Sequence, residues 1–103
     1  MMTAHILYKN IDSKNLATFS STIIKNIIRK KLNFKGILMS DDISMKALSK
    51  NLILNAEKAL NAGCNLVLYC NGDIKESRKL LKKLRFIDNF TQKKTYQFYD
   101  FLR

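Results

Sequence analysis

Polar side chains that could do chemistry lie at two places in the sequence, each within or just after an apolar run. Thr3 and His5 interrupt the first run, and Ser40–Asp42 follows the second. Carboxylate and imidazole groups are the side chains that most often act as nucleophiles and as general acids or bases. In parallel α/β folds the active site lies at the carboxyl ends of the strands. The two places are therefore candidates for one shared site.

The adjacent carboxylates Asp41 and Asp42 point in opposite directions if their strand is regular, because side chains alternate between the two faces. Asp41 then shares a face with Ile37 and Met39. The pair cannot supply the two facing carboxyl groups, about 5 Å apart, that a retaining glycosidase needs. At most one carboxylate is catalytic, and the other caps a helix that we expect to begin at Ile43. From the residues alone, helix capping by both is an equal alternative.

The elements that must position these residues are predicted by hydrophobic periodicity and by capping residues. Three apolar runs predict buried parallel strands, at residues 2–8, 36–41 and 65–70. Four segments predict helices, at residues 20–31, 43–50, 52–62 and 73–85. Asn33 and Gly63 suit the ends of the first and third helices. The aromatic tail, 86–103, has no clear period and is left unassigned, so residues 1–85 form the predicted unit.

This order of strands and helices, with connections of crossover length, is typical of an α/β fold. Strands that are apolar on both faces need helices on both sides or closure into a barrel. Three parallel strands achieve neither, because both outer strands keep unpaired backbone groups. The sequence therefore predicts one α/β unit whose sheet is incomplete by itself.

Composition and charge exclude several classes of protein. A content of 47% hydrophobic and 26% charged residues is that of a globular chain. No apolar run approaches the roughly 18 residues of a membrane span, and no secretory signal is visible, so we expect a cytoplasmic protein without a membrane partner. The net charge of +11 divides as +6 over residues 1–72 and +5 over residues 73–103. Because the excess is spread along the chain, we favour compositional bias over a nucleic-acid groove.

The two cysteines, Cys64 and Cys70, bound the third predicted strand. In a strand they would lie about 20 Å apart, which is too far for a disulfide. Their spacing does not match a zinc motif, and His5 is the sole histidine. We therefore expect two buried thiols, no metal site and no cofactor.

Three stretches within residues 2–73 carry a family resemblance: MTAHILYKNIDSKNLATFS, IIRKKLNFKGILMSDDISMKAL and AEKALNAGCNLVLYCNGD. They resemble the closing part of bacterial β-N-acetylglucosaminidases of glycoside hydrolase family 3, and FKGILMSDDISM is the most specific piece. The resemblance implies a partial (β/α)8 TIM barrel, roughly its last three β/α units. It also implies an enzyme that removes N-acetylglucosamine from peptidoglycan fragments in the cytoplasm during cell-wall recycling.

The resemblance assigns roles to three residues. The first Asp of the motif is the family's nucleophile and corresponds to Asp41, which would act by double displacement with retention. The dipole of a helix beginning near Ile43 would keep this carboxylate charged. His5 would line the pocket, by a direct sugar contact or by a structural hydrogen bond. Met45 would lie beside the pocket or fill the core.

The family's sugar-binding Asp and Arg, its Lys-His motif and its acid/base loop all precede the matched segment. We therefore expect a fragment without activity of its own, whose implied substrate is a muropeptide or saccharide containing N-acetylglucosamine. One alternative is a half-enzyme completed by a separately encoded upstream barrel segment. Another is a basic nucleic-acid-binding module using the helix at 73–85, although no stacking ladder of aromatic residues supports it.

Overall fold

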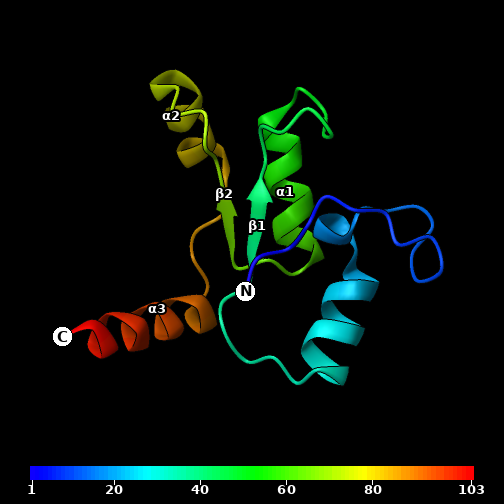
Figure 1. Ribbon diagram of the computed structural model, residues 1–103. Helices are drawn as coiled ribbons and strands as arrows, with labels where there is room; N and C mark the ends of the chain where they lie inside the picture. Colours follow the sequence, from blue (N-terminus) through cyan, green and yellow to red (C-terminus); the bar gives the residue numbers. More distant parts are fainter.

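The computed structural model describes all 103 residues, and two parallel strands lie at its centre (Figure 1). These are β1 (Met39–Asp42) and β2 (Leu66–Leu68). A single parallel bridge between Met2 and Met39 adds the N-terminal segment to the other edge of β1. The predicted parallel arrangement is confirmed, but each strand is shorter than its apolar run.

The expected first strand, 2–8, is wrong beyond its opening residues. The Thr3 amide donates to the Met39 carbonyl at 2.8 Å, and the chain then leaves β1. The carbonyls of Ala4 and Ile6 instead accept hydrogen bonds from the helical turn η1 (Ala17–Phe19). Because no neighbouring strand pairs with them, residues 6–8 stay exposed despite their apolar character.

The helix predicted at 20–31 is present as η2 (Thr22–Lys31). The Ser20 hydroxyl accepts a hydrogen bond from the Ile23 amide at 3.1 Å, which confirms its expected capping role. The backbone bonds of this helix span five residues, as in the 2.8 Å bond from the Leu32 amide to the Ile27 carbonyl. Asn33 then adopts the left-handed conformation, with φ of 51°, and ends the helix as expected.

The short helix expected at 43–50 does not form, and turns occupy this stretch. Its backbone groups are taken by side chains instead. Asn55, which is buried, donates from Nδ2 to the carbonyls of Ile43 at 3.1 Å and Ser49 at 2.8 Å. A helix would need the Ile43 carbonyl for an amide of its own, so here a tertiary hydrogen bond replaces a local one.

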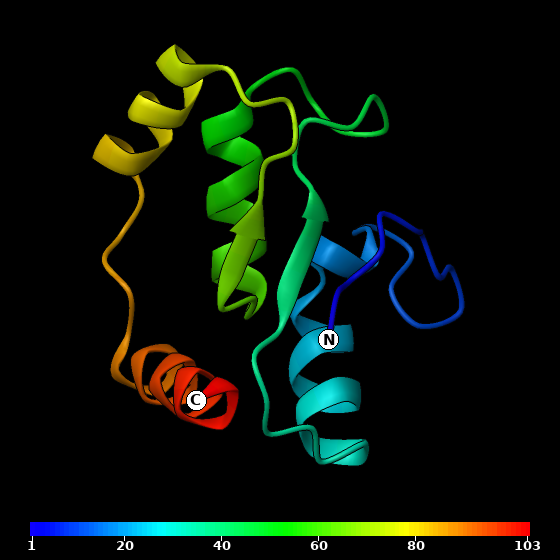
Figure 2. The same cartoon turned by 60° about the vertical axis from the view of Figure 1, so that its left-hand side comes forward.

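Three α-helices follow. α1 (Leu52–Ala62) ends at Gly63, whose φ of 123° suits glycine and confirms the predicted C-terminus. α2 (Ile74–Lys83) begins at the capping residue Asp73, in the predicted place. α3 (Asn89–Leu102) occupies the tail that the sequence left unassigned, and it lies near the amino ends of the strands (Figures 1 and 2).

The core lies between the strands and the helices, in two clusters. One joins Ile24 of η2 and Leu38 to Cys64 and to alanines of α1. The other joins Ile43 to α1 and to Leu80 of α2. Cys64 is buried as expected, but Cys70 is exposed because β2 ends before it, so the prediction of two buried thiols is wrong for Cys70. Both cysteines are free.

The N-terminus of α3 is tied to the sheet by a set of hydrogen bonds. Asn65 donates to the Thr91 hydroxyl at 3.0 Å and accepts from Arg29 at 2.7 Å. The Arg29 guanidinium also lies over the rings of Phe34 and Phe90. The tail is therefore anchored at its start, while the aromatic residues near its end remain exposed.

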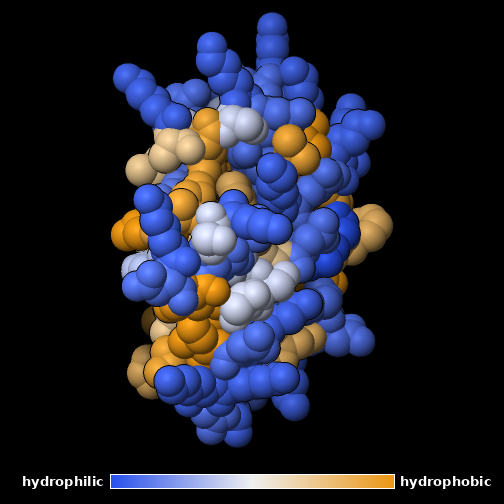
Figure 3. Space-filling view, turned by 90° about the vertical axis from the view of Figure 1, so that its right-hand side faces the viewer, coloured by the Kyte–Doolittle hydropathy of each residue, from blue (hydrophilic) through white to orange (hydrophobic).

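The large number of exposed apolar side chains bears on behaviour in solution. Figure 3 shows one face, which is largely hydrophilic with apolar residues gathered toward one side. Unpaired strand edges and exposed apolar residues favour association. We expect the isolated chain to form oligomers or aggregates or to stay molten, as measured by sedimentation velocity and thermal scans. A monodisperse monomer with sharp cooperative unfolding would contradict this expectation.

Candidate functional site

Side chains replace backbone groups where β1 pairs with β2. Met39 is opposite Leu66 and Asp42 is opposite Leu68, so β1 carries one extra residue between these pairs. The buried Ser40 hydroxyl accepts the Leu68 amide at 3.0 Å, in place of a backbone carbonyl. Such bulges are frequent beside active sites, where they redirect a side chain. Strict alternation therefore does not hold at the carboxyl end of β1.

Asp41 follows Ser40 in this irregular stretch and is half-buried. One carboxylate oxygen, Oδ1, accepts the Asp42 amide at 2.8 Å. Its second oxygen accepts no hydrogen bond from the protein. The helix at Ile43 that was expected to keep this carboxylate charged does not form, so the dipole argument fails for this structure.

The Asp42 carboxylate, in contrast, is engaged on both oxygens. It accepts the Ser44 amide at 3.0 Å, the Ser44 hydroxyl at 2.8 Å and the Cys70 amide at 3.1 Å. Burial raises the pKa of Asp42, but the hydrogen bonds from Ser44 and Cys70, together with nearby His5, outweigh it and lower the pKa overall. Asp42 does not cap a helix, as was expected for one of the pair. It forms a turn and fastens β1 to the end of β2.

His5 approaches β1 from the other edge. Its Nε2 lies 2.8 Å from the Asp42 carbonyl, and its Nδ1 lies 2.9 Å from the Thr18 hydroxyl. The Thr18 hydroxyl lies 2.9 Å from that of Thr3. Because a carbonyl can only accept, Nε2 carries the proton, and a neutral ring accepts from Thr18 at Nδ1. Both ring nitrogens therefore have protein partners.

Met45 lies on the loop that follows β1, and its amide donates to the Asp42 carbonyl at 3.3 Å. Its side chain is 43% exposed. The core role considered from the sequence is therefore wrong. The Asp42 carbonyl therefore binds both His5 and the backbone of Met45. Because Asp41 directly precedes Asp42, all three predicted site residues lie near the carboxyl end of β1.

Two residues of this network were not identified from the sequence. Thr18 is fully buried and bonds His5, while Asn55 holds the loop after β1. A buried polar residue must find hydrogen-bond partners. A Thr or Asn inside an apolar stretch is a signal that the sequence does contain. That signal does not identify the hydrogen-bond partner, which lies 13 residues away for Thr18 and 12 residues away for Asn55.

Two further observations concern metal ions and membranes. No group of three or more His, Cys, Asp or Glu side chains is placed to hold a metal ion. None of the helices combines the length and the apolar character needed to cross a membrane. The chemically notable group at the site is the Asp41 carboxylate, which has one oxygen without a protein partner and lies at the carboxyl end of a parallel strand.

This arrangement defines an α/β protein of the parallel type, with its candidate site at the carboxyl ends of the strands. Residues 1–95 match the model of the glycosyl hydrolase family 3 N-terminal domain. The chain belongs to this family. The match runs into α3, beyond the unit predicted from the sequence.

Similar proteins agree with this assignment. A β-hexosaminidase of Haemophilus influenzae (strain PittEE) is 47% identical over 73 residues, covering 69% of this chain and 21% of that protein. Zinc-bound CbsA from Thermotoga neapolitana superposes with a TM-score of 0.82 at 32% identity, covering 99% of this chain and 25% of that chain. NagZ from Neisseria gonorrhoeae, in complex with N-trifluoroacetyl-D-glucosamine, gives 0.74 at 30% identity, covering 90% and 28%. The chain thus spans about a quarter of its relatives' length.

Proposed function

We propose that this chain is the nucleophile-bearing segment of a retaining β-N-acetylglucosaminidase, and that it corresponds to roughly the last three β/α units of a TIM barrel. The observation that carries the proposal is Asp41, which lies in the family motif and keeps one carboxylate oxygen without a protein partner. The parallel pairing of β1 with β2 and of Met2 with Met39 fits such a segment. We place α3 in the same unit, because Asn65 anchors it.

In the proposed reaction the free oxygen of Asp41 attacks the anomeric carbon of N-acetylglucosamine. The glycosidic carbon–oxygen bond breaks, and the leaving oxygen takes a proton from an acid in another part of the barrel. Water then attacks the glycosyl ester, gives up its proton to the same group acting as base, and releases the sugar with its configuration retained. The substrate class is a saccharide or muropeptide ending in N-acetylglucosamine, in the cytoplasm, as the resemblance implies.

His5 is proposed as a positioning residue in this mechanism. Its two ring nitrogens are held by Thr18 and by the Asp42 carbonyl, which supports a structural role over a direct sugar contact. Because Asp42 directly follows Asp41, the hydrogen bond to the Asp42 carbonyl fixes the backbone one residue after the nucleophile. Met45, exposed on the adjoining loop, remains a candidate for contact with the sugar.

Acid catalysis and most sugar contacts lie outside the matched segment in the resemblance, and acid/base help alone contributes about 10² to 10⁴ in rate. We therefore expect the isolated chain to show no turnover of a chromogenic β-N-acetylglucosaminide. The control is an equal amount of the Asp41→Asn variant. Turnover by the chain that disappears in this variant would show that the segment suffices for catalysis.

A second experiment supplies the rest of the barrel, using the residues of the Haemophilus influenzae β-hexosaminidase that precede its match to this chain. If turnover appears, Asp41→Asn should abolish it. The Asn side chain can still accept the hydrogen bond from the Asp42 backbone amide, but it lacks the carboxylate oxygen that attacks the sugar. Asp42→Asn, the matched control, should leave much of the activity, because its Oδ1 can still accept the Ser44 and Cys70 amides. Equal losses would overturn the assignment of Asp41.

The role of His5 is tested in the same assembly. We expect His5→Ala to lower kcat about tenfold to 10²-fold with little change in KM, because the nucleophile is displaced while sugar binding remains. His5→Gln, which can still donate to the Asp42 carbonyl, should recover part of the loss. A rise in KM at constant kcat would instead indicate a direct sugar contact.

A further inference from the structure

Three hydrogen bonds in a row connect the side chain of Thr3 to the carboxyl end of β1. Thr3 Oγ1 lies 2.9 Å from Thr18 Oγ1, which lies 2.9 Å from His5 Nδ1. His5 Nε2 lies 2.8 Å from the carbonyl oxygen of Asp42. Both threonines are buried. These four residues therefore form a hydrogen-bond chain that ends one residue after Asp41.

The acceptor at the end of this hydrogen-bond chain sets the direction of every bond in it. A carbonyl only accepts, so His5 donates from Nε2 and, in its neutral form, accepts at Nδ1. Thr18 has a single hydroxyl hydrogen, and this hydrogen goes to His5. The bond between the two hydroxyls then uses the hydrogen of Thr3. Thr18 is thus the middle group, and its loss would leave both neighbours without a partner.

The backbone of Thr18 is held from two sides. Thr18 lies in η1, and its amide donates to the Ala4 carbonyl at 3.3 Å. The buried Cys64 thiol, which follows α1, donates to the Thr18 carbonyl at 4.0 Å. Burial raises the pKa of this thiol to about 11, so the thiol keeps its proton at neutral pH. The Thr18 hydroxyl is therefore presented to His5 from a fixed position.

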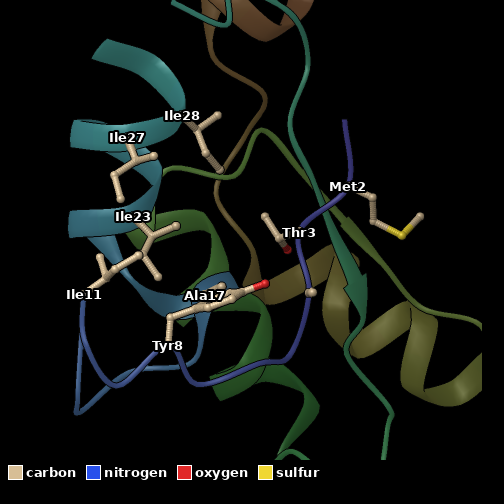
Figure 4. A pocket seen from close by; sticks show the side chains of 9 residues that line it. Met2, Thr3, Tyr8, Ile11, Ala17, Ile23, Ile27 and Ile28 are labelled. Atoms are coloured by element: carbon tan, nitrogen blue, oxygen red, sulfur yellow. The ribbon is translucent and has the colours of Figure 1, made fainter. Parts of the chain in front are cut away.

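The surroundings of this hydrogen-bond chain are largely apolar. A hollow of about 310 Å³ beside Thr3 is lined mainly by isoleucines of η2 and by alanines (Figure 4). The ring of Phe19, the neighbour of Thr18, has its centroid 6.3 Å from that of His5. The turn η1 therefore constrains the imidazole twice, by a hydroxyl at Nδ1 and by an aromatic ring beside it.

We propose that Thr18 is a positioning residue of the glycosidase site, because its hydroxyl fixes both the orientation and the proton position of the His5 ring. His5 in turn fixes the backbone that follows Asp41. The partner of one ring nitrogen determines what the other nitrogen can do, so an unpaired Nδ1 would free the ring to turn away from the Asp42 carbonyl. The proposal rests on the proposed function, since it takes Asp41 as the nucleophile.

Kinetics test this role in the assembly with the upstream segment of the Haemophilus influenzae β-hexosaminidase. Thr18→Val removes the hydroxyl and nearly keeps the shape of the side chain. We expect it to lower kcat about tenfold with KM within about twofold, because the nucleophile is displaced while sugar binding remains. Thr18→Ser, which keeps a hydroxyl, should recover most of the loss.

The matched control is Thr91→Val. Thr91 is also a buried threonine, and its hydroxyl accepts from Asn65 at 3.0 Å, but it lies in α3 near the amino ends of the strands. The same chemical change there should leave kcat within about twofold. Equal losses of kcat in the two valine variants, or unchanged kcat in Thr18→Val, would overturn the proposal.

Nitrogen NMR tests the hydrogen bond without reference to turnover. His5 is the sole histidine of this chain, so labelling the chain with ¹⁵N-histidine and leaving the upstream segment unlabelled reports on one ring. At about pH 8, where an ordinary imidazole is neutral, we expect a protonated Nε2 and an Nδ1 that accepts a hydrogen bond. Thr18→Val should shift the Nδ1 resonance toward that of a free acceptor nitrogen, and Thr18→Ser should return it. A proton on Nδ1, or an unchanged resonance in Thr18→Val, would overturn the proposal.

The outcomes distinguish this proposal from the proposed function. Turnover that survives Asp41→Asn would overturn the proposed function, whatever the Nδ1 resonance shows. A shifted Nδ1 resonance with unchanged kcat in Thr18→Val would overturn the positioning role and leave Asp41 as the nucleophile.

An assembly without turnover still tests whether Thr18 holds the strand end. The Ile43 amide donates to the Leu68 carbonyl at 2.9 Å, directly after β1, so its hydrogen exchange measures how firmly this end is held. Exchange about tenfold faster in Thr18→Val than in Thr91→Val would support the proposal. Equal exchange in the two variants would overturn it.

Discussion

On both edges of strand β1, side chains make hydrogen bonds that backbone groups would make in a regular sheet. The position of the strand end, and with it the candidate site, depends on these hydrogen bonds. On one edge Ser40 accepts the Leu68 amide at the end of β2 and Asp42 accepts the Cys70 amide just beyond it. On the other edge His5 binds the Asp42 carbonyl. Each replaced bond lies at the carboxyl end of the strand, next to Asp41. Because a buried polar group without a partner costs about 1–3 kcal/mol, these contacts hold the strand end in one conformation.

The hydrogen bonds that hold the site differ in kind from the contacts that hold the core. Leu38 and Ile43 pack against the helices on one side of β1, which sets where the strand lies. The polar network sets the direction of the last residues of the strand. The Asp42 carboxylate accepts most of the nearby hydrogen-bond donors, and the Asp41 carboxylate accepts one. One oxygen of Asp41 therefore stays free.

The same structure is closed on one side and open at the edges. Helices cover one face of β1 and β2, while the outer edge of β2 and the apolar residues near it remain uncovered. Relatives about four times as long share the fold of this segment. Completion of the sheet by further strands would satisfy the open edge, in agreement with the barrel architecture proposed for the whole enzyme.

Local rules predicted much of this protein from the sequence: η2, α1, the start of α2 and the parallel direction of the strands. The family resemblance, not a local rule, supplied Asp41 as the candidate nucleophile. Only tertiary structure decided the bulge at Ser40, the loss of a helix after Ile43 and the burial of Thr18. The reason is physical. Periodicity and capping act between residues three or four apart, whereas Asn55 and His5 act on backbone groups 12 and 37 residues away, which no local pattern encodes.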